Sequence, residues 1–99
     1  MSITSTAEVA TDRPHRLAKQ LVTHLSRKIE WVTEDGGSTA THGTGSGSVA
    51  PHDGVIVLTA TGETEADVAM FEDVLGRHLQ KFAFRHPVEV SWTRKDAEA

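Results

Sequence analysis

The sequence contains no cysteine and no tyrosine, and only two Trp and three Phe among its 99 residues. The absence of cysteine excludes disulfide bonds, thiolate metal sites, iron–sulfur clusters and cysteine nucleophiles. No apolar run is long enough for a transmembrane helix. The first residues, Met1 to Thr6, lack the basic start and apolar core of a signal peptide. We therefore expect a cytoplasmic protein that does not associate with a membrane.

Positive charge is also scarce, because the formal net charge is −4. This balance argues against nucleic acid as a partner. Five basic residues lie between Asp12 and Glu30, and five acidic residues lie between Glu63 and Asp73. Solvated helix faces, with acids near a helix N-terminus, explain this pattern. The alternative is a homodimer in which the basic helix of one copy meets the acidic helix of another.

The first half of the chain predicts a strand, a helix and the start of a hairpin. Ile3 to Ala10 has strand periodicity, and its polar residues favour an edge position. A helix follows, with Pro14 in its first turn and its end near Lys28. Ile29 to Thr33 is rich in strand formers, and the turn signal at residues 34–37 predicts a hairpin.

The second half predicts two strands, a helix and a closing strand. Ser38 to Ala50 contains three glycines, and we expect one poorly buried strand, with a low-complexity linker as the alternative. Val55 to Ala60 is a continuous apolar run suited to the centre of a sheet. Apolar residues spaced by three and four predict a helix from about Thr64 to Phe82. Val88 to Trp92 alternates as a half-buried strand does.

The predicted element order is (β)-α-β-β-β-α-β, within a single domain over residues 1–99. Short hairpins in the middle predict an α+β fold, with a mainly antiparallel sheet of four to five strands and two helices packed on one face. We expect an ordered core over about residues 4–94 and a tail over residues 95–99. Both helix–strand pairs place His-Leu near the helix end and Trp in the strand, which either an internal repeat or chance explains.

No standard catalytic or nucleotide-binding motif occurs in its required context. Gly45 to Ala50 matches G-x-G-x-x-A, but a turn and a strand follow it, whereas a dinucleotide site needs a helix there. The sequence has no P-loop, no His-Glu-x-x-His motif and no nucleophile elbow. We therefore assign no catalytic residue and expect a protein that is not an enzyme.

Two of the six histidines, His24 and His78, lie on the apolar stripes of the two predicted helices. A core-facing imidazole needs hydrogen-bond partners, and two such structural histidines are one interpretation. The other is that the helices lie side by side and bring both rings to one pocket, where they hold a metal or supply a general base. Two histidines alone make a weak metal site, and Glu30, Glu72 and Glu89 are the carboxylates available to complete it.

Two further groups allow both a structural and a functional interpretation. Trp31 and Trp92 are core or interface aromatics on strands, or residues that stack on a ligand. Arg77, Lys81 and Arg85 lie toward the end of the second helix. They either complement the helix dipole or bind an anion.

The C-terminal part carries a family resemblance. Arg77 to Arg85, RHLQKFAFR, followed by Val88 to Trp92, VEVSW, resembles the ending of the bacterial domain-of-unknown-function 2218 family, and Leu21 to Leu25, LVTHL, agrees with its first helix. The resemblance covers about residues 4–94. The chain departs from the family at Leu25 and over Thr41 to Ser48, where an aromatic residue is expected, and both departures weaken an aromatic-lined pocket. The resemblance implies no settled activity, and it implies a contextual association with siderophore-interacting, iron-uptake proteins.

These observations leave three functional hypotheses. The first is a non-enzymatic accessory or binding module that self-associates, with an unidentified small-molecule ligand. The second is a metal- or iron/siderophore-linked protein that uses His24 and His78, the one cofactor hypothesis that the residues support. The third is a small enzyme with a histidine base, which lacks an accompanying nucleophile or carboxylate pair.

Overall fold

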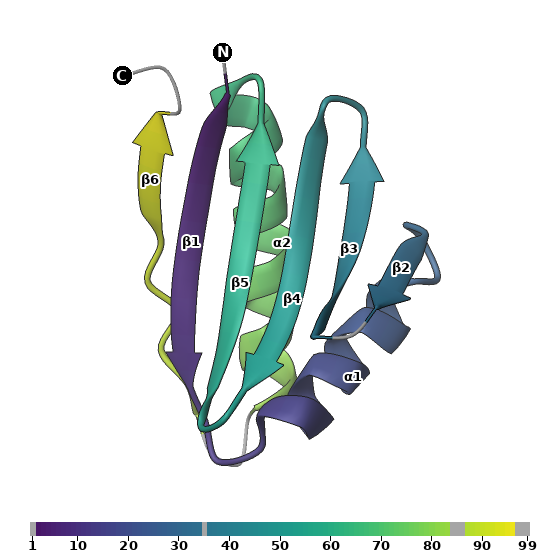
Figure 1. Ribbon diagram of the computed structural model, residues 1–99, viewed down its shortest axis with the longest axis vertical. Helices are drawn as coiled ribbons and strands as arrows, with labels where there is room; N and C mark the ends of the chain where they lie inside the picture. The colour runs from purple at the N-terminus through teal and green to yellow at the C-terminus, as the bar shows by residue number, and fades with distance from the viewer. Residues whose placement is uncertain (1, 35, 84–86, 97–99) are drawn as a thin grey trace.

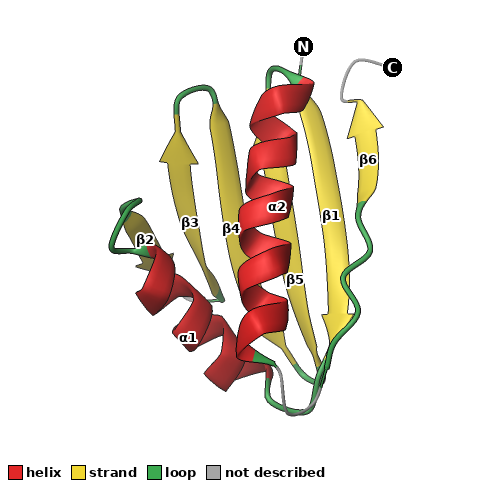
Figure 2. Ribbon diagram, turned by 180° about the vertical axis from the view of Figure 1, so that it is seen from behind, coloured by secondary structure: helices red, strands yellow, loops and turns green. Residues whose placement is uncertain are grey.

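The computed structural model describes residues 2–34, 36–83 and 87–96. They form one six-stranded antiparallel sheet with two helices on one face (Figures 1 and 2). The elements are β1 (Ile3–Ala10), α1 (Pro14–Leu25), β2 (Trp31–Glu34), β3 (Gly37–His42), β4 (Gly45–His52), β5 (Val55–Gly62), α2 (Glu65–Phe82) and β6 (Thr93–Asp96). The sheet order is β2-β3-β4-β5-β1-β6. The predicted α+β class is confirmed, with slightly more strands than the four to five expected.

The core lies between the sheet and the two helices. Central strand β5 points every second side chain toward the helices, as the strand period of two requires. α1 and α2 supply their predicted leucines, and α2 adds a fully buried Phe71. The largest fully buried side chains are Phe71, Leu21, Ile56, Leu58, Leu75, Leu79, Val9, Val49 and Val68.

Strand β1 lies between β5 and β6, so the edge position expected for it was wrong. Its Ser5, Ala7 and Val9 are buried beneath the helices. The alternate residues, including Thr4 and Thr6, point to the opposite face. The polar character of β1 therefore reflects a sheet face without helices and not a sheet edge.

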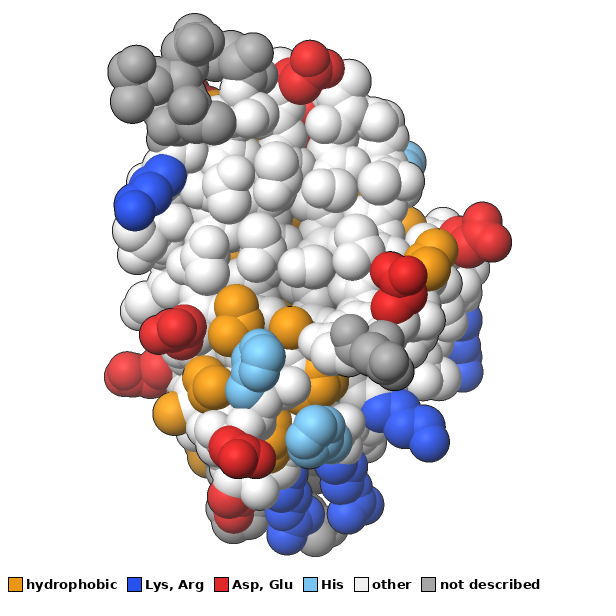
Figure 3. Space-filling model, viewed as in Figure 1, with side chains coloured by type: hydrophobic (Ala, Val, Ile, Leu, Met, Phe, Trp, Pro, Cys, Tyr) orange, Lys and Arg blue, Asp and Glu red, His pale blue; other side chains and the backbone are white. Residues whose placement is uncertain are grey.

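That uncovered face is rich in hydroxyl groups. Threonine and serine residues of four adjacent strands pair across it in two rows. Figure 3 shows the upper part of this face almost free of apolar and charged side chains. The paired residues are Thr4, Thr61, Ser46 and Thr41 in one row, and Thr6, Thr59, Ser48 and Thr39 in the other. Hydroxyl groups hydrogen-bond readily to water, so this face is suited to solvent. The histidine pair and the Glu72–Arg94 ion pair described below lie on the helix side of the sheet.

The glycine-rich segment 38–50 contributes to two strands, so the single frayed strand expected there was wrong. β3 and β4 are joined by a turn in which Gly43 has a φ of +63°. Gly45 and Gly47 face α2, where a Cβ added to Gly47 would lie 2.5 Å from Cδ1 of Phe71. The glycines therefore make room for an aromatic ring, and no helix follows them to form a dinucleotide site.

The strand predicted at residues 88–92 was also wrong. This segment runs beside α2 without pairing in the sheet (Figure 2). The predicted alternation of burial is nevertheless present, because Val88, Val90 and Trp92 are half-buried and pack against the core. Gly76 of α2 admits them, since a Cβ there would lie 3.3 Å from Cγ1 of Val90 and 3.4 Å from Nε1 of Trp92.

Strand β6 closes the sheet beside β1, with Ser5 paired to Arg94. It continues to Asp96, two residues into the segment expected as a tail. His86, in the corner predicted before the final strand, lies outside the described residues. So does Asp35 in the β2–β3 turn.

Candidate functional site

His24 of α1 and His78 of α2 lie next to each other at the surface. Their ring centroids are 5.2 Å apart, and the ring planes are tilted by 40°. The ring of Phe82 meets His24 edge-on, with centroids 5.3 Å apart. The structure therefore has the side-by-side helices of the second interpretation, with two imidazoles and a phenyl ring in one cluster.

The expectation of two core-facing histidines was wrong for His24. Its side chain is exposed, and that of His78 is half-buried. Leu21 and Leu25 occupy the core-facing positions of the same helical stripe. The apolar stripe of α1 is wide, and His24 lies at its edge, so the ring is at the rim of the helix–helix contact. The imidazole pair is consequently accessible to a ligand from solvent.

A backbone hydrogen bond fixes the tautomer of His78. Its Nδ1 lies 2.7 Å from the carbonyl oxygen of Val74. A carbonyl can only accept, so Nδ1 carries a proton and donates it. In the neutral ring the free lone pair is then on Nε2. This nitrogen is the atom that would bind a metal or accept a proton. Orientation of a histidine through its second nitrogen is common among metal-binding histidines.

The surroundings of His24 favour its neutral form. Partial desolvation of the ring lowers the pKa of His24 from its ordinary value of 6.5, and nearby positive charge lowers it further. The neighbouring groups responsible are the second imidazole, His78, and the cations Arg27, Lys81 and Lys28. At neutral pH His24 is therefore mainly an uncharged imidazole, the form in which histidine acts as a ligand.

A shallow groove of about 340 Å³ extends from His24 along the exposed side of α1. Its lining residues are Arg16, Lys19, Gln20, Thr23, His24, Arg27 and Phe82. Three cations and no carboxylate line it, and none of these cations forms an ion pair within the described part of the chain. The groove therefore favours an anion, whose hydrophobic part could rest against Phe82.

The carboxylates proposed to complete a metal site do not join the imidazole pair. No cluster of three or more His, Asp or Glu residues suited to a metal occurs within residues 2–34, 36–83 and 87–96. Neither Glu30 nor Glu89 therefore reaches the pair. Glu72 instead accepts hydrogen bonds from Ser5 Oγ at 2.5 Å and from Arg94 Nε at 3.0 Å and Nη2 at 2.7 Å. The bond from Arg94, followed by that from Ser5, lowers the pKa of Glu72.

The two tryptophans are core aromatics, in agreement with their structural interpretation. Trp31 is half-buried and packs against the larger cluster of buried residues, which includes Leu21 and Leu58. Trp92 contacts that cluster and also a smaller one formed by Ala60, Val68 and Phe71. Nε1 of Trp31 is buried and has no hydrogen-bond partner among the described atoms. Of the helix-end cations, Arg77 pairs with Asp73 on the exposed face at 2.9 Å, which fits a helix-surface role. Arg85 lies outside the described residues.

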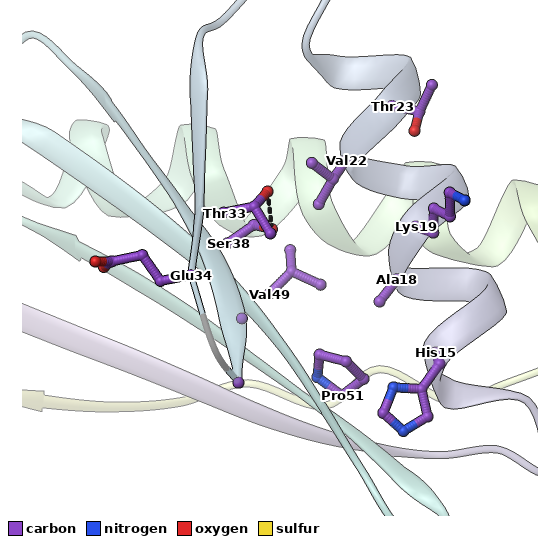
Figure 4. A pocket seen from close by; sticks show the side chains of 12 residues that line it. His15, Ala18, Lys19, Val22, Thr23, Thr33, Glu34, Ser38, Val49 and Pro51 are labelled. Carbon is purple, nitrogen blue, oxygen red and sulfur yellow. Dashed lines mark hydrogen bonds between the residues drawn. The ribbon is translucent and has the colours of Figure 1, made fainter.

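A larger cavity, of about 480 Å³, is lined by residues of α1 and of strands β2, β3 and β4 (Figure 4). Its lining residues are His15, Ala18, Lys19, Val22, Thr23, Thr33, Glu34, Gly36, Gly37, Ser38, Val49 and Pro51. Sequence reasoning missed it because these residues come from segments far apart in the chain. The available signal was the run of small residues around Gly36, which cannot fill the space beneath a helix.

These features define a small α+β domain, with two helices on one face of an antiparallel sheet and an imidazole pair where the helices meet. The chain belongs to the family described as "Uncharacterized protein conserved in bacteria (DUF2218)", whose model matches residues 6–93. This confirms the family resemblance. The NMR structure of PA4090 from Pseudomonas aeruginosa is similar, with a TM-score of 0.78 and 22% identity, over 92% of this chain and 95% of that chain. No curated protein matches the chain. Within the described residues, neither helix is long and apolar enough to cross a membrane.

Proposed function

We propose that this protein is a non-enzymatic binding module whose imidazole pair, His24 and His78, holds a metal ion that arrives as an anionic complex. The observation that carries the proposal is the 5.2 Å separation of the two ring centroids. Imidazole nitrogens bind transition metals at about 2.0–2.1 Å, which places two rings on one ion about 4.5–5.2 Å apart, centroid to centroid. The observed separation is therefore compatible with both rings binding one ion.

The charges around the pair favour a complex over a bare cation. No described carboxylate is available to neutralise the metal, and Arg27, Lys28 and Lys81 place positive charge nearby. A bare metal cation is repelled by these positive charges, whereas a metal that carries its own carboxylate or other anionic oxygen ligands is attracted by them. It must also keep two adjacent coordination positions open for the imidazoles. Iron suits imidazole ligands, and a ferric complex of an iron-uptake chelator belongs to this class when the chelator leaves two adjacent positions of the iron unfilled.

Nickel(II) nitrilotriacetate tests the proposal, because it is an anionic chelate with two adjacent open positions. We expect the purified protein to bind this chelate. We expect weaker binding of aqueous nickel(II), because the positive charges near the imidazole pair repel a free cation. The variants His24→Gln and His78→Gln should each lose at least about tenfold in affinity for the chelate, since one nitrogen ligand is lost. Isothermal titration calorimetry measures both affinities.

His52→Gln is the matched control, because His52 is an exposed histidine on β4, a strand that carries neither member of the pair. Its affinity for the chelate should equal that of the unmodified protein. Circular dichroism checks that each variant is folded. Equal binding by a His24→Gln, His78→Gln double variant would show that the chelate binds elsewhere and would overturn the proposal.

We also propose that two copies associate through strand β2. This strand is at the edge of the sheet, so one side of its backbone is unpaired. It carries Val32, which is 61% exposed and is the exposed large hydrophobic residue of the described chain. Sedimentation equilibrium should give twice the chain mass of 10.7 kDa, and Val32→Lys should shift it toward the monomer. A monomer at millimolar concentration would contradict this arrangement.

A further inference from the structure

The cavity between α1 and strands β2–β4 is separate from the imidazole pair. We infer that it binds a hydrophobic carboxylate, with the apolar body of the ligand inside the cavity and the carboxylate at the rim beside α1. Its volume of about 480 Å³ falls within the range of about 300–1,000 Å³ that is typical of small-molecule sites. The inference does not depend on the proposed metal function.

Apolar side chains form the interior of this cavity. Figure 4 shows Ala18 and Val22 of α1 directed toward Val49 and Pro51 of β4 across the open space. The space remains because α1 packs against α2, β4 and β5 and only sparsely against β2 and β3. Its walls at Ala18 and Ser38 are too small to fill it. A hydrocarbon body is the occupant that gains from such a lining.

One hydroxyl pair marks the wall of the cavity. Thr33 Oγ1 and Ser38 Oγ lie 2.9 Å apart and hydrogen-bond to each other (Figure 4). Ser38 is only 8% exposed, so its hydroxyl has little access to bulk water. The pair uses one of its two hydroxyl hydrogens internally, and the second can be donated to an acceptor oxygen. An oxygen-bearing ligand can therefore be oriented at this wall.

The rim selects the charge of the ligand. His15 and Lys19 lie on the α1 side, whereas the side chain of Glu34 in Figure 4 extends away from the open space. Lys19 also lines the groove beside the imidazole pair, as does Thr23. A cation at the mouth of an apolar cavity is complementary to a carboxylate on an apolar chain, and a neutral or cationic chain gains no such attraction.

Sodium decanoate and its neutral analogue decanol are the probes for this site. We expect decanoate to bind the full chain and to shift the backbone amide signals of the cavity-lining residues in ¹H–¹⁵N NMR spectra. Val22→Phe places a ring in the cavity and should abolish the shifts. Lys19→Met should weaken decanoate by about two- to fivefold, the range for an exposed charge pair, without changing the affinity for decanol.

Two controls separate this site from the groove and from the metal site. Arg16→Met removes a cation of the same helix that lines only the groove, and His24→Gln removes half of the imidazole pair. Both should leave decanoate affinity unchanged. Thr33→Val, at an exposed position, gives a second cavity variant if Val22→Phe fails to fold, and it should weaken binding. Shifts confined to other surfaces, or equal binding to all variants, would overturn the inference.

Discussion

Substitution of Gly47 by alanine tests why a glycine-rich segment forms a buried strand. The new Cβ would lie 2.5 Å from Cδ1, 2.9 Å from Cε1 and 3.2 Å from Cγ of Phe71, whereas ordinary contacts begin at 3.4 Å. The Phe71 ring is fully buried, so it cannot move into solvent. Either the ring or the helix that carries it must shift by about 1 Å, which is overpacking of a core.

The expected cost follows from two opposing effects. Overpacking of this kind destabilises a core by about 1–3 kcal/mol. Alanine also restricts the unfolded chain more than glycine does, which returns about 0.5–1 kcal/mol. Because a 2.5 Å approach is far inside ordinary contact distance, the overpacking cost lies in the upper part of its range, at about 2–3 kcal/mol. The net loss in the free energy of unfolding is therefore about 1–2.5 kcal/mol, which corresponds to a fall of roughly 4–20 °C in Tm for a domain of this size.

Urea denaturation of a double-mutant cycle measures this effect. Phe71→Leu removes the ring atoms that face Gly47, so Gly47→Ala should cost at least about 1 kcal/mol less in that background. Ser48→Ala is the control, because Ser48 is adjacent in the strand but faces the uncovered side of the sheet. The reasoning is refuted if Gly47→Ala is as stable as the unmodified protein, or if its cost is the same beside leucine.

Two further predictions concern polar contacts that hold the elements together. Glu72→Ala should cost about 1–3 kcal/mol, because the fully buried hydroxyl of Ser5 loses its partner; equal stability would contradict this. The bond from Arg94 lowers the pKa of Glu72 below its ordinary 4.5. The stability that the Glu72 carboxylate contributes should therefore be complete above pH 4.5 and lost as the pH falls through the lowered pKa. Urea denaturation of the unmodified protein and of Glu72→Ala at a series of acidic pH values measures this loss. Thr64 Oγ1 accepts from the backbone nitrogen of Asp67 at 3.2 Å, so Thr64→Ala should cost about 0.5–2 kcal/mol in thermal unfolding while Thr64→Ser keeps the cap. A full loss on substitution by serine would show that the hydroxyl is not what matters.

Local patterns in the sequence were sufficient for the elements that bury a continuous stripe. The spacing of Val68, Phe71, Leu75 and Leu79 predicted α2, and these residues are fully buried. The apolar run from Val55 predicted a central strand, which is β5. In each case, the signal and the burial that causes it lie within the same short segment.

The errors arose where the meaning of a residue depends on a distant partner. The reason for a glycine at position 47 is visible only together with Phe71, which is far away in the sequence but contacts Gly47 in the fold. The alternation over residues 88–92 identifies the buried side correctly but does not distinguish sheet pairing from packing against a helix. The helical stripe shows which side of α1 carries His24, but not how closely α1 packs against α2 at that position, and so not whether the ring is buried. The cavity cannot be predicted from any one segment, because its walls come from α1, β2, β3 and β4.

The central claim is that His24 and His78 act together as two nitrogen ligands to one metal. Electron spin echo modulation of copper(II) nitrilotriacetate bound to the protein counts the coordinated imidazoles directly. The account predicts two imidazoles in the unmodified protein and one in either His→Gln variant, as expected from two rings whose centroids are 5.2 Å apart. A single coordinated imidazole in the unmodified protein, or a spectrum unchanged in the double variant, would contradict it.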